Sequence, residues 1–218
     1  MNGSTPEPAL LARSLCFAYR DADAVHDVDL EVGFGEIVAI AGPNGSGKST
    51  LIELLAGVRR PRRGSIERNG SLALVVQRPI APDALPVTVA DVVAIGTWST
   101  TDRMPRATVR DAIAEAIERV GMSDHAARPL TALSGGQRQR TFLAQGIVGR
   151  PGILLLDEPA AGLDRASVER TRRILAEEAA RGAAVVCVTH DEWAIAEADR
   201  VVRMEHGCVV AQDTRSAA

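Results

Sequence analysis

The stretch "GPNGSGKST", residues 42–50, constrains this chain more than any other feature of its sequence. It follows an apolar run, "EIVAIA", and leads into "LIELLAG", so we expect a buried strand, a glycine loop and then a helix from Lys48 to about Gly57. The spacing matches G-x-x-x-x-G-K-[S/T], a loop whose backbone N–H groups surround phosphates. The sequence therefore predicts an α/β core that binds a nucleoside triphosphate.

Most positions of this loop have a physical task. Gly42, Gly45 and Gly47 allow the backbone to fold around the phosphates, and the helix N-terminus adds its dipole. Lys48 is expected to reach the β- and γ-phosphates, and Ser49 to offer an oxygen to Mg²⁺. A plain glycine turn is the alternative, but such a pattern arises by chance in about one chain in a hundred of this length. The predicted nucleotide contacts also include the remaining loop residues, Pro43, Asn44, Ser46 and Thr50.

Further polar residues follow predicted core strands. The run "GILLLDE" delivers Asp157 and Glu158 to the carboxyl end of a strand, where α/β sheets bind their ligands. We expect Asp157 to hold Mg²⁺, and Glu158 to polarise or orient the attacking water. His190 ends the run "AAVVCVTH", and a neutral imidazole there could contact the γ-phosphate and the water. Gln77 ends another strand and could reach Mg²⁺ or water, although the residues alone favour an ordinary polar strand end.

The rest of the chain divides into recognisable segments. Residues 1–11 are predicted to be a disordered tail, and residues 12–218 a single domain. Its core and β subdomain are expected over about 12–78 and 150–214, with an inserted helical subdomain over about 79–149. Helical periodicity in the insertion begins at Thr88 and Asp91, which form a capping-box pattern. Elsewhere we expect a solvated loop at "RRPRRG". After it, two strands, "SIER" and "LALVVQ", are expected to be joined as a hairpin at Asn69-Gly70. A closing hairpin is expected at "RVVRMEHGCVVAQ".

A second stretch, "LSGGQRQR" at residues 133–140, also resembles a phosphate-binding helix start. Ser134 and Gln137 fit the capping box S-x-x-Q, which by itself would simply begin a helix. That interpretation leaves Gly135 and Gly136 unexplained, because glycine in a first turn is costly unless a backbone must be approached closely. Since the first loop already surrounds one face of a nucleotide, this second site is expected to serve a nucleotide held by another copy.

These motifs, in this order and spacing, resemble the ATP-binding subunit of ABC transporters over nearly the whole chain. The resemblance implies a P-loop NTPase cassette with a mixed β core, an antiparallel β subdomain and an inserted helical subdomain. It also implies a head-to-tail dimer in which ATP and Mg²⁺ lie between one phosphate loop and the partner's "LSGGQ". Tyr19 corresponds to the aromatic residue that stacks on adenine, Asp164 to the loop that crosses the dimer interface, and Gln77 to the residue that senses the transmembrane partner.

Composition excludes several other classes. The formal net charge of -3 argues against bulk binding of nucleic acid. The three cysteines are far apart, so neither a disulfide scaffold nor a cysteine zinc site is expected. The longest apolar runs are too short to cross a membrane. The family resemblance, and not the composition, implies a place at the cytoplasmic face of the cell membrane. It also implies separate permease subunits as partners and, indirectly, a solute-binding protein.

The transported substrate is indicated only by resemblance. The segment "VVQRPIAPDALPVTVADVVAIG" and the segment from "LSGGQ" to "GLD" are similar to the ATPases of zinc and manganese importers. The ATPases of siderophore, haem and cobalamin importers are close alternatives. A further alternative is the soluble ATPase of iron–sulfur assembly, which is not a transporter subunit. We expect Gln77 and residues 79–133 to form the surface that receives the permease.

Overall fold

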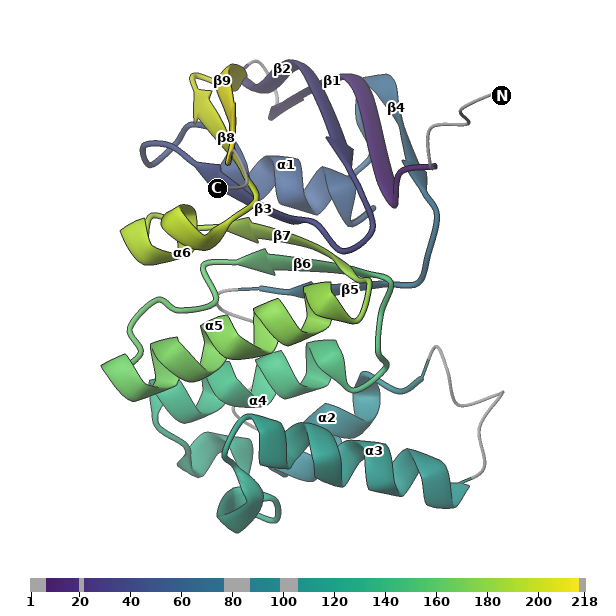
Figure 1. The fold of residues 1–218 in the computed structure, drawn as a ribbon, viewed down its shortest axis with the longest axis vertical. Helices are drawn as coiled ribbons and strands as arrows, with labels where there is room; N and C mark the ends of the chain where they lie inside the picture. Colours follow the sequence, from purple (N-terminus) through teal and green to yellow (C-terminus); the bar gives the residue numbers. More distant parts are fainter. Residues whose placement is uncertain (1–6, 20–21, 77–86, 99–105, 216–218) are drawn as a thin grey trace.

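The computed structural model describes residues 7–19, 22–76, 87–98 and 106–215, which form two β-sheets with helices between and below them (Figure 1). Gln77 and the segment 77–86 lie outside the described residues. The strands are β1 (Leu10–Tyr19), β2 (Ala22–Val32), β3 (Ile37–Ala41), β4 (Arg63–Arg68), β5 (Leu72–Val75), β6 (Ile153–Asp157), β7 (Ala184–Val188), β8 (Arg200–Glu205) and β9 (Cys208–Thr214). The α-helices are α1 (Lys48–Leu55), α2 (Val89–Ile95), α3 (Arg106–Arg119), α4 (Gly135–Ile147), α5 (Arg165–Ala180) and α6 (Glu192–Glu197), and short 3-10 turns cover η2 (Ser123–His125) and η3 (Leu130–Ala132).

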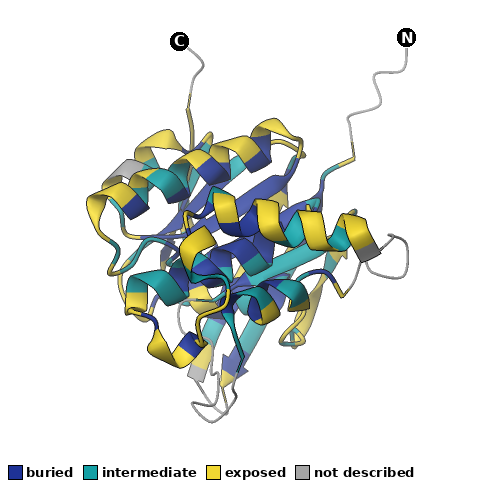
Figure 2. Cartoon of the chain, turned by 90° about the horizontal axis from the view of Figure 1, so that it is seen from below, coloured by how far each residue is buried: buried dark blue, intermediate teal, exposed yellow. Residues whose placement is uncertain are grey.

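The larger sheet is mixed, with the strand order β5-β6-β7-β3-β8-β9. All neighbouring pairs are parallel except β8 and β9, which form the predicted closing hairpin. Its central strands are apolar on both faces, as parallel strands covered by other layers must be. In β6, for example, Ile153 and Leu155 join the core toward α1, whereas Leu154 and Leu156 join the core toward α4 and α5. Figure 2 shows these strands buried beneath helices with exposed outer faces.

The smaller sheet is antiparallel, with the order β2-β1-β4. Val28, Leu30 and Val32 alternate with exposed residues along β2, which is the pattern of a sheet buried on one face only. Their side chains pack in the same apolar core as Leu51, Ile52, Leu54 and Leu55 of α1. Helix α1 therefore lies between the two sheets (Figure 1), and the glycine loop after β3 leads into its N-terminus.

The helices α2, α3 and α4 are inserted between β5 and β6, as predicted. Their apolar faces form a second core with α5, and this core includes Val93, Ile117 and Ile147. The capping box at the start of α2 is confirmed, because the Thr88 side chain accepts from the Asp91 N–H and the Asp91 carboxylate accepts from Thr88 N at 2.8 Å. The mixed sheet, the antiparallel sheet and the helical insertion confirm the predicted cassette fold.

Two predictions about the β-strands were wrong. The tail does not extend to residue 11, because Ala9 and Leu10 are fully buried and β1 begins at Leu10. The segments β4 and β5 do not form a hairpin, although Asn69-Gly70 favours a tight turn. Instead β4 pairs with β1, β5 pairs in parallel with β6, and Asn69 Nδ2 donates to the Pro8 carbonyl at 2.8 Å. The chain thus passes from one sheet to the other at this point.

Candidate active site

The loop between β3 and α1 needs its glycines for two separate reasons. Gly42, Gly45 and Gly47 all have positive φ angles, of 151°, 81° and 97°. A Cβ on Gly42 would also lie 2.1 Å from the Met204 carbonyl oxygen, and one on Gly47 would lie 2.1 Å from that of Ala24. Since L-residues rarely adopt these angles and no side chain tolerates such contacts, the loop keeps its shape only with glycine here.

Lys48 is the first residue of α1, and its side chain is fixed against the loop. The residue is 7% exposed, and Nζ donates to the carbonyls of Gly42 and Pro43, both at 2.8 Å. The N-cap residue of α1 is Gly47, which has no side chain that could accept from the first N–H groups of the helix. A buried ammonium beside the N-terminus of a helix is a strongly favourable setting for phosphate.

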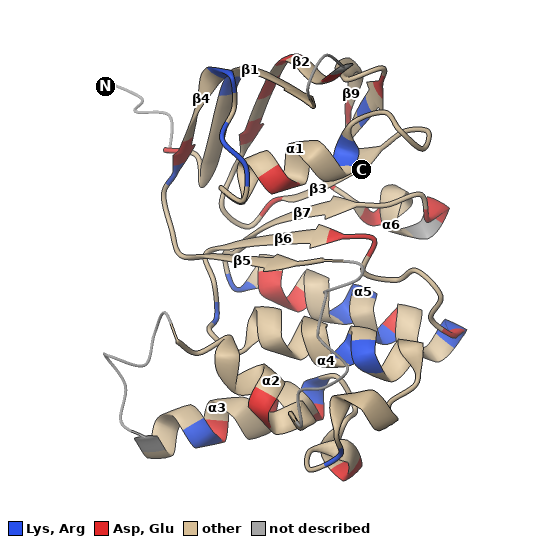
Figure 3. Cartoon of the chain, turned by 180° about the vertical axis from the view of Figure 1, so that it is seen from behind, with Lys and Arg blue, Asp and Glu red and all other residues tan. Residues whose placement is uncertain are grey.

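Two carboxylates lie at the carboxyl end of β6, since Asp157 is its last residue and Glu158 follows it, and this acidic segment is visible in Figure 3. Glu158 has a positive φ of 51°, and its N–H donates to the Val188 carbonyl at 2.9 Å. This unusual conformation for a non-glycine residue is held by the bond to β7. The Glu158 side chain is 15% exposed, and its Oε1 lies 2.9 Å from His190 Nδ1. The two residues that sequence analysis placed on neighbouring strands are therefore in direct contact.

Asp157 has the character of a cation ligand. Its Oδ1 is buried and has no hydrogen-bond partner among the residues that the structure describes. Burial raises the pKa of this carboxyl, and the negative charges of Glu158 and Glu53 add to the effect, although a hydrogen bond from Ser49 and the charge of Lys48 oppose it. A buried carboxylate oxygen without a donor fits a hard cation such as Mg²⁺, which prefers oxygen ligands. The observed residues thus fit a magnesium ion held by Asp157 and Ser49.

A cavity of about 600 Å³ is lined by residues of the glycine loop and of α1 and by residues at the ends of β6 and β7, although Asp157 is not among its lining residues. Lys48, Ser49, Glu158 and His190 all line it, and so does Tyr19, which has 43% of its surface exposed. Its lining also includes Asn44, Gly45, Gly47 and Thr50 from the predicted set, and Asp23 and Ala24, which sequence analysis had not singled out. Asp23 and Ala24 belong to β2, and no local sequence signal marks them as neighbours of the loop.

The second predicted site lies elsewhere on the chain. Ser134 Oγ accepts from Gln137 N at 3.3 Å, and Ser134 N donates to Gln137 Oε1 at 2.9 Å, so the capping box is confirmed. Gln137 Nε2 also lies 3.0 Å from His125 Nε2, a contact that sequence analysis missed because η2 is distant in sequence. Neither Ser134 nor the two glycines line the cavity of the first loop. Within one chain, therefore, the glycine loop and the start of α4 do not form one site.

The two glycines of this motif have no backbone strain to explain them. Gly135 is exposed, and a Cβ there would meet no atom of the chain within 4 Å. A Cβ on Gly136 would meet only Leu163 Cδ2, at 3.3 Å.

Asp164 has an evident role within the chain, since its Oδ1 accepts from Ser167 N at 2.7 Å and caps α5, and this bond lowers its pKa.

Comparison with known proteins supports the same assignment. The family model described as "ABC transporter" matches residues 25–161. The chain belongs to the ABC transporter family. It is the ATP-binding subunit, and ABC cassettes of this kind hydrolyse ATP to power transport.

Two relatives illustrate the breadth of this similarity. The hemin import ATP-binding protein HmuV of Rhodopseudomonas palustris is 37% identical over 226 residues, covering 93% of this chain and 84% of that protein. The zinc import ATP-binding protein ZnuC of Ruegeria pomeroyi is 38% identical over 212 residues, covering 92% and 77%. Among solved structures, an inward-facing ABC transporter of the metal-chelate type matches with a TM-score of 0.81 and 30% identity, over 96% of this chain and 83% of that one. None of the helices in the described part of this ABC ATPase is long and apolar enough to span a membrane.

Proposed function

We propose that this ABC ATPase hydrolyses ATP in the cavity beside α1, with Glu158 as the residue that polarises the attacking water. The observation that carries the proposal is the Glu158–His190 contact of 2.9 Å, which faces the same cavity as Lys48. Lys48 would hold the β- and γ-phosphates, and His190 would contact the γ-phosphate. Because phosphoryl transfer depends mainly on positioning and electrostatics, a carboxylate held on a fixed backbone suits the task.

We further propose that Asp157 and Ser49 hold Mg²⁺ in this site, together with Gln77. A bound magnesium ion would neutralise charge that develops on the phosphate oxygens. The buried Oδ1 of Asp157, which has no hydrogen-bond partner among the described residues, supports this assignment. The ring of Tyr19, half-exposed at the edge of the cavity, would stack on the adenine base.

The complete catalytic site is proposed to need a second copy. Ser134 and Gly135 are exposed at the start of α4 and do not reach the cavity of their own chain. A backbone N-terminus with open space above it is suited to an anion brought by another molecule. In a head-to-tail dimer, the signature residues Ser134, Gly135, Gly136 and Gln137 would close over the partner's ATP, with the Asp164 loop at the interface.

The experiment that tests the catalytic assignment compares two variants. Glu158→Gln removes the charged group but keeps the phosphate loop, so we expect normal ATP affinity and turnover reduced at least about a hundredfold. Lys48→Ala removes a phosphate contact, so ATP affinity itself should fall. Near-normal turnover of Glu158→Gln would refute the role of Glu158, and unchanged affinity of Lys48→Ala would place the phosphates elsewhere.

The proposed cargo is a divalent metal, zinc or manganese, carried by a separate permease at the cytoplasmic face of the membrane. The similarity to the zinc import protein supports this, and the equally strong similarity to the hemin import protein supports the alternative of a haem, siderophore or cobalamin importer. A deletion strain should then grow poorly under chelation and recover with excess Zn²⁺ or Mn²⁺. Recovery with haem, a siderophore or cobalamin would favour the alternative.

The permease is proposed to dock on the helical insertion near α2. Ile95 and Trp98 are large apolar residues with 39% and 71% of their surface exposed at the end of this helix. Trp98→Ala should reduce uptake while the isolated subunit keeps its ATPase activity. Loss of that activity would show that this face belongs to the catalytic core and not to a docking surface.

A further inference from the structure

We infer that Arg59 is a positioning residue for the nucleotide base, acting through Tyr19. The inference rests on the proposed stacking of adenine on Tyr19. The guanidinium carbon of Arg59 lies 4.7 Å from the centroid of the Tyr19 ring and 5.7 Å from that of the Phe17 ring. Both distances are within the range in which a cation is attracted to an aromatic face. The loop "RRPRRG", expected to be solvated, therefore places its first arginine against the only tyrosine of the chain.

Three contacts fix the plane of the Tyr19 ring. Phe17 packs edge to face against it, with centroids 5.0 Å apart and an angle of 85°. The Tyr19 hydroxyl lies 3.3 Å from Thr50 Oγ1 at the start of α1. Arg59 covers a face of the ring, and Tyr19 and Thr50 line the nucleotide cavity whereas Arg59 does not. The guanidinium therefore supports the ring from outside the cavity, and Tyr19 itself is 43% exposed, which leaves part of its surface available to a base.

Arg59 is itself anchored to the helix that carries the phosphate loop. Its Nε donates to Glu53 Oε2, and Glu53 lies on α1 with Lys48 and Thr50. Only about a third of each side chain in this ion pair is exposed, so the guanidinium is held in one orientation. The ring and the phosphate loop are thus tied to the same helix. A pre-ordered ring loses less conformational freedom when a base stacks on it, and this order should appear as nucleotide affinity.

This arrangement predicts an effect on the base and not on the phosphates. Arg59→Met retains an unbranched apolar side chain without the cation. ADP binding should weaken by about twofold and by no more than about fivefold, because the ring order that one partly exposed cation–π contact maintains in the free protein cannot be worth more than the contact itself. Binding of pyrophosphate, which has no base, should be unchanged. The KM for ATP should rise by the same factor while turnover at saturating ATP stays within about 1.5-fold, because Arg59 does not line the cavity.

The test is isothermal titration of the full chain with Mg-ADP and, separately, with Mg-pyrophosphate. Arg60→Met, which changes an exposed arginine of the same loop, is the matched control and should bind both ligands normally. Glu53→Gln should reproduce part of the Arg59→Met effect, because it releases the anchor. Tyr19→Ala should weaken ADP binding more than either.

The outcomes separate the inference from the function on which it rests. Unchanged ADP affinity in Arg59→Met, with weakened affinity in Tyr19→Ala, would overturn the inference and leave the stacking intact. Tighter ADP binding in Arg59→Met would also overturn it, since Arg59 would then compete with the base. Equal losses for ADP and pyrophosphate would mean a general structural effect and would overturn it too. Normal ADP binding by Tyr19→Ala would instead refute the proposed stacking.

Discussion

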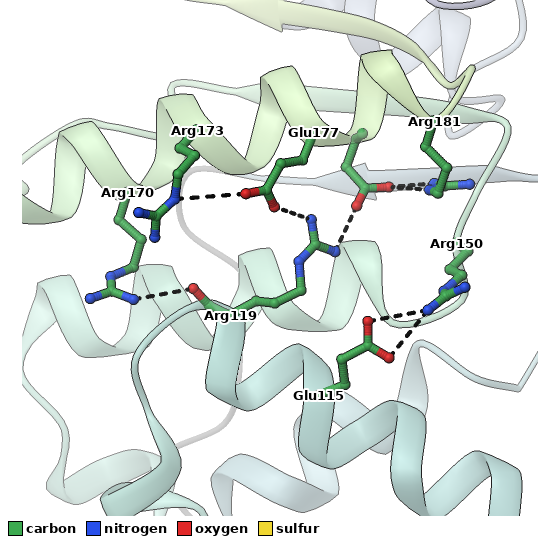
Figure 4. A network of polar contacts seen from close by, with 8 residues as sticks. Glu115, Arg119, Arg150, Arg170, Arg173, Glu177 and Arg181 are labelled. Atoms are coloured by element: carbon green, nitrogen blue, oxygen red, sulfur yellow. Dashed lines mark hydrogen bonds and ion pairs between the residues drawn. The ribbon is translucent and has the colours of Figure 1, made fainter.

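Replacement of Glu178 should destabilise the protein more than that of any other carboxylate in the network of Figure 4. Glu178 lies on α5 with a side chain 1% exposed, and its carboxylate accepts from Arg119 Nη1 of α3 at 2.7 Å and from Arg181. Arg119 also donates to Glu177 at 2.9 Å. Burial acts to lower the pKa of Arg119, but the hydrogen bonds to Glu177 and Glu178 outweigh it and raise the pKa. The network therefore joins the helical insertion to the helix that covers the larger sheet.

The magnitude follows from what Glu178→Ala leaves behind. Removing one partner of a buried ion pair costs about 3–5 kcal/mol of unfolding free energy. Arg119 keeps Glu177 and is 24% exposed, and Arg181 is 34% exposed, so we expect the lower end, about 3 kcal/mol. Glu178→Gln retains the shape and one acceptor, and should cost about 1–2 kcal/mol.

The assay is equilibrium unfolding in urea at neutral pH. Glu169→Ala is the matched control on the same helix, because its side chain is 70% exposed and its bond to Arg172 is a surface pair. Such a pair contributes at most about 1 kcal/mol. A loss in Glu178→Ala no larger than that of Glu169→Ala would refute the reasoning that burial makes this contact important.

Three further predictions concern the site and its supports. Asp157→Asn should raise the melting temperature at pH 7 while turnover is lost, because burial raises the pKa of Asp157 and its ionised form therefore destabilises the fold. The gain should vanish as the pH falls below the ordinary aspartate pKa of about 4, where the native and unfolded carboxyls are both protonated. Ser134→Ala removes the acceptor of the Gln137 N–H and should cost about 1 kcal/mol in urea unfolding. Gly96→Ala would place a Cβ 2.0 Å from the Gln145 carbonyl oxygen and should cost about 1–3 kcal/mol.

Each of these predictions has a matched control. Asp124→Asn changes an exposed aspartate and should leave the melting temperature unchanged at both pH values, so an equal gain there would contradict the role of burial. Thr131→Ala lies just before the signature motif on an exposed position and should cost less than Ser134→Ala. Gly70→Ala has its nearest contact at 3.6 Å, so a cost similar to that of Gly96→Ala would contradict the steric argument.

The predictable part of the fold was the part coded locally. The glycine loop and the apolar runs of β3 and β6 each specify their own conformation, and parallel strands bring their carboxyl ends to one edge, so the meeting of Glu158 and His190 could be expected. The segment after β4 could not, because Asn69-Gly70 suits a hairpin turn equally well. The two strands on either side of this turn pair with other strands instead of with each other: β4 pairs with β1, and β5 pairs with β6. Both partner strands lie far from the turn in the sequence.

Contacts between distant side chains were also beyond the sequence. His125 reaches Gln137, and Arg59 reaches Tyr19, only after the helices and the small sheet have packed. No spacing or periodicity marks either residue, since both lie in segments that look like polar connections. Gly135, by contrast, can be singled out from the sequence alone, because a glycine in the first turn of a helix carries a conformational-entropy cost. Among the described residues the structure shows no contact that requires glycine at this position.

The shared site is tested most directly by measuring ATPase activity in mixed dimers of Lys48→Ala and Ser134→Arg chains. If each site takes its phosphate loop from one chain and its signature from the other, the mixed dimer combines both defects in one site and leaves the second site whole. The mixture should then recover activity that neither variant has alone, in proportion to the heterodimers captured with two different affinity tags. Heterodimers that form but hydrolyse ATP no faster than either variant alone would contradict a site shared between two copies.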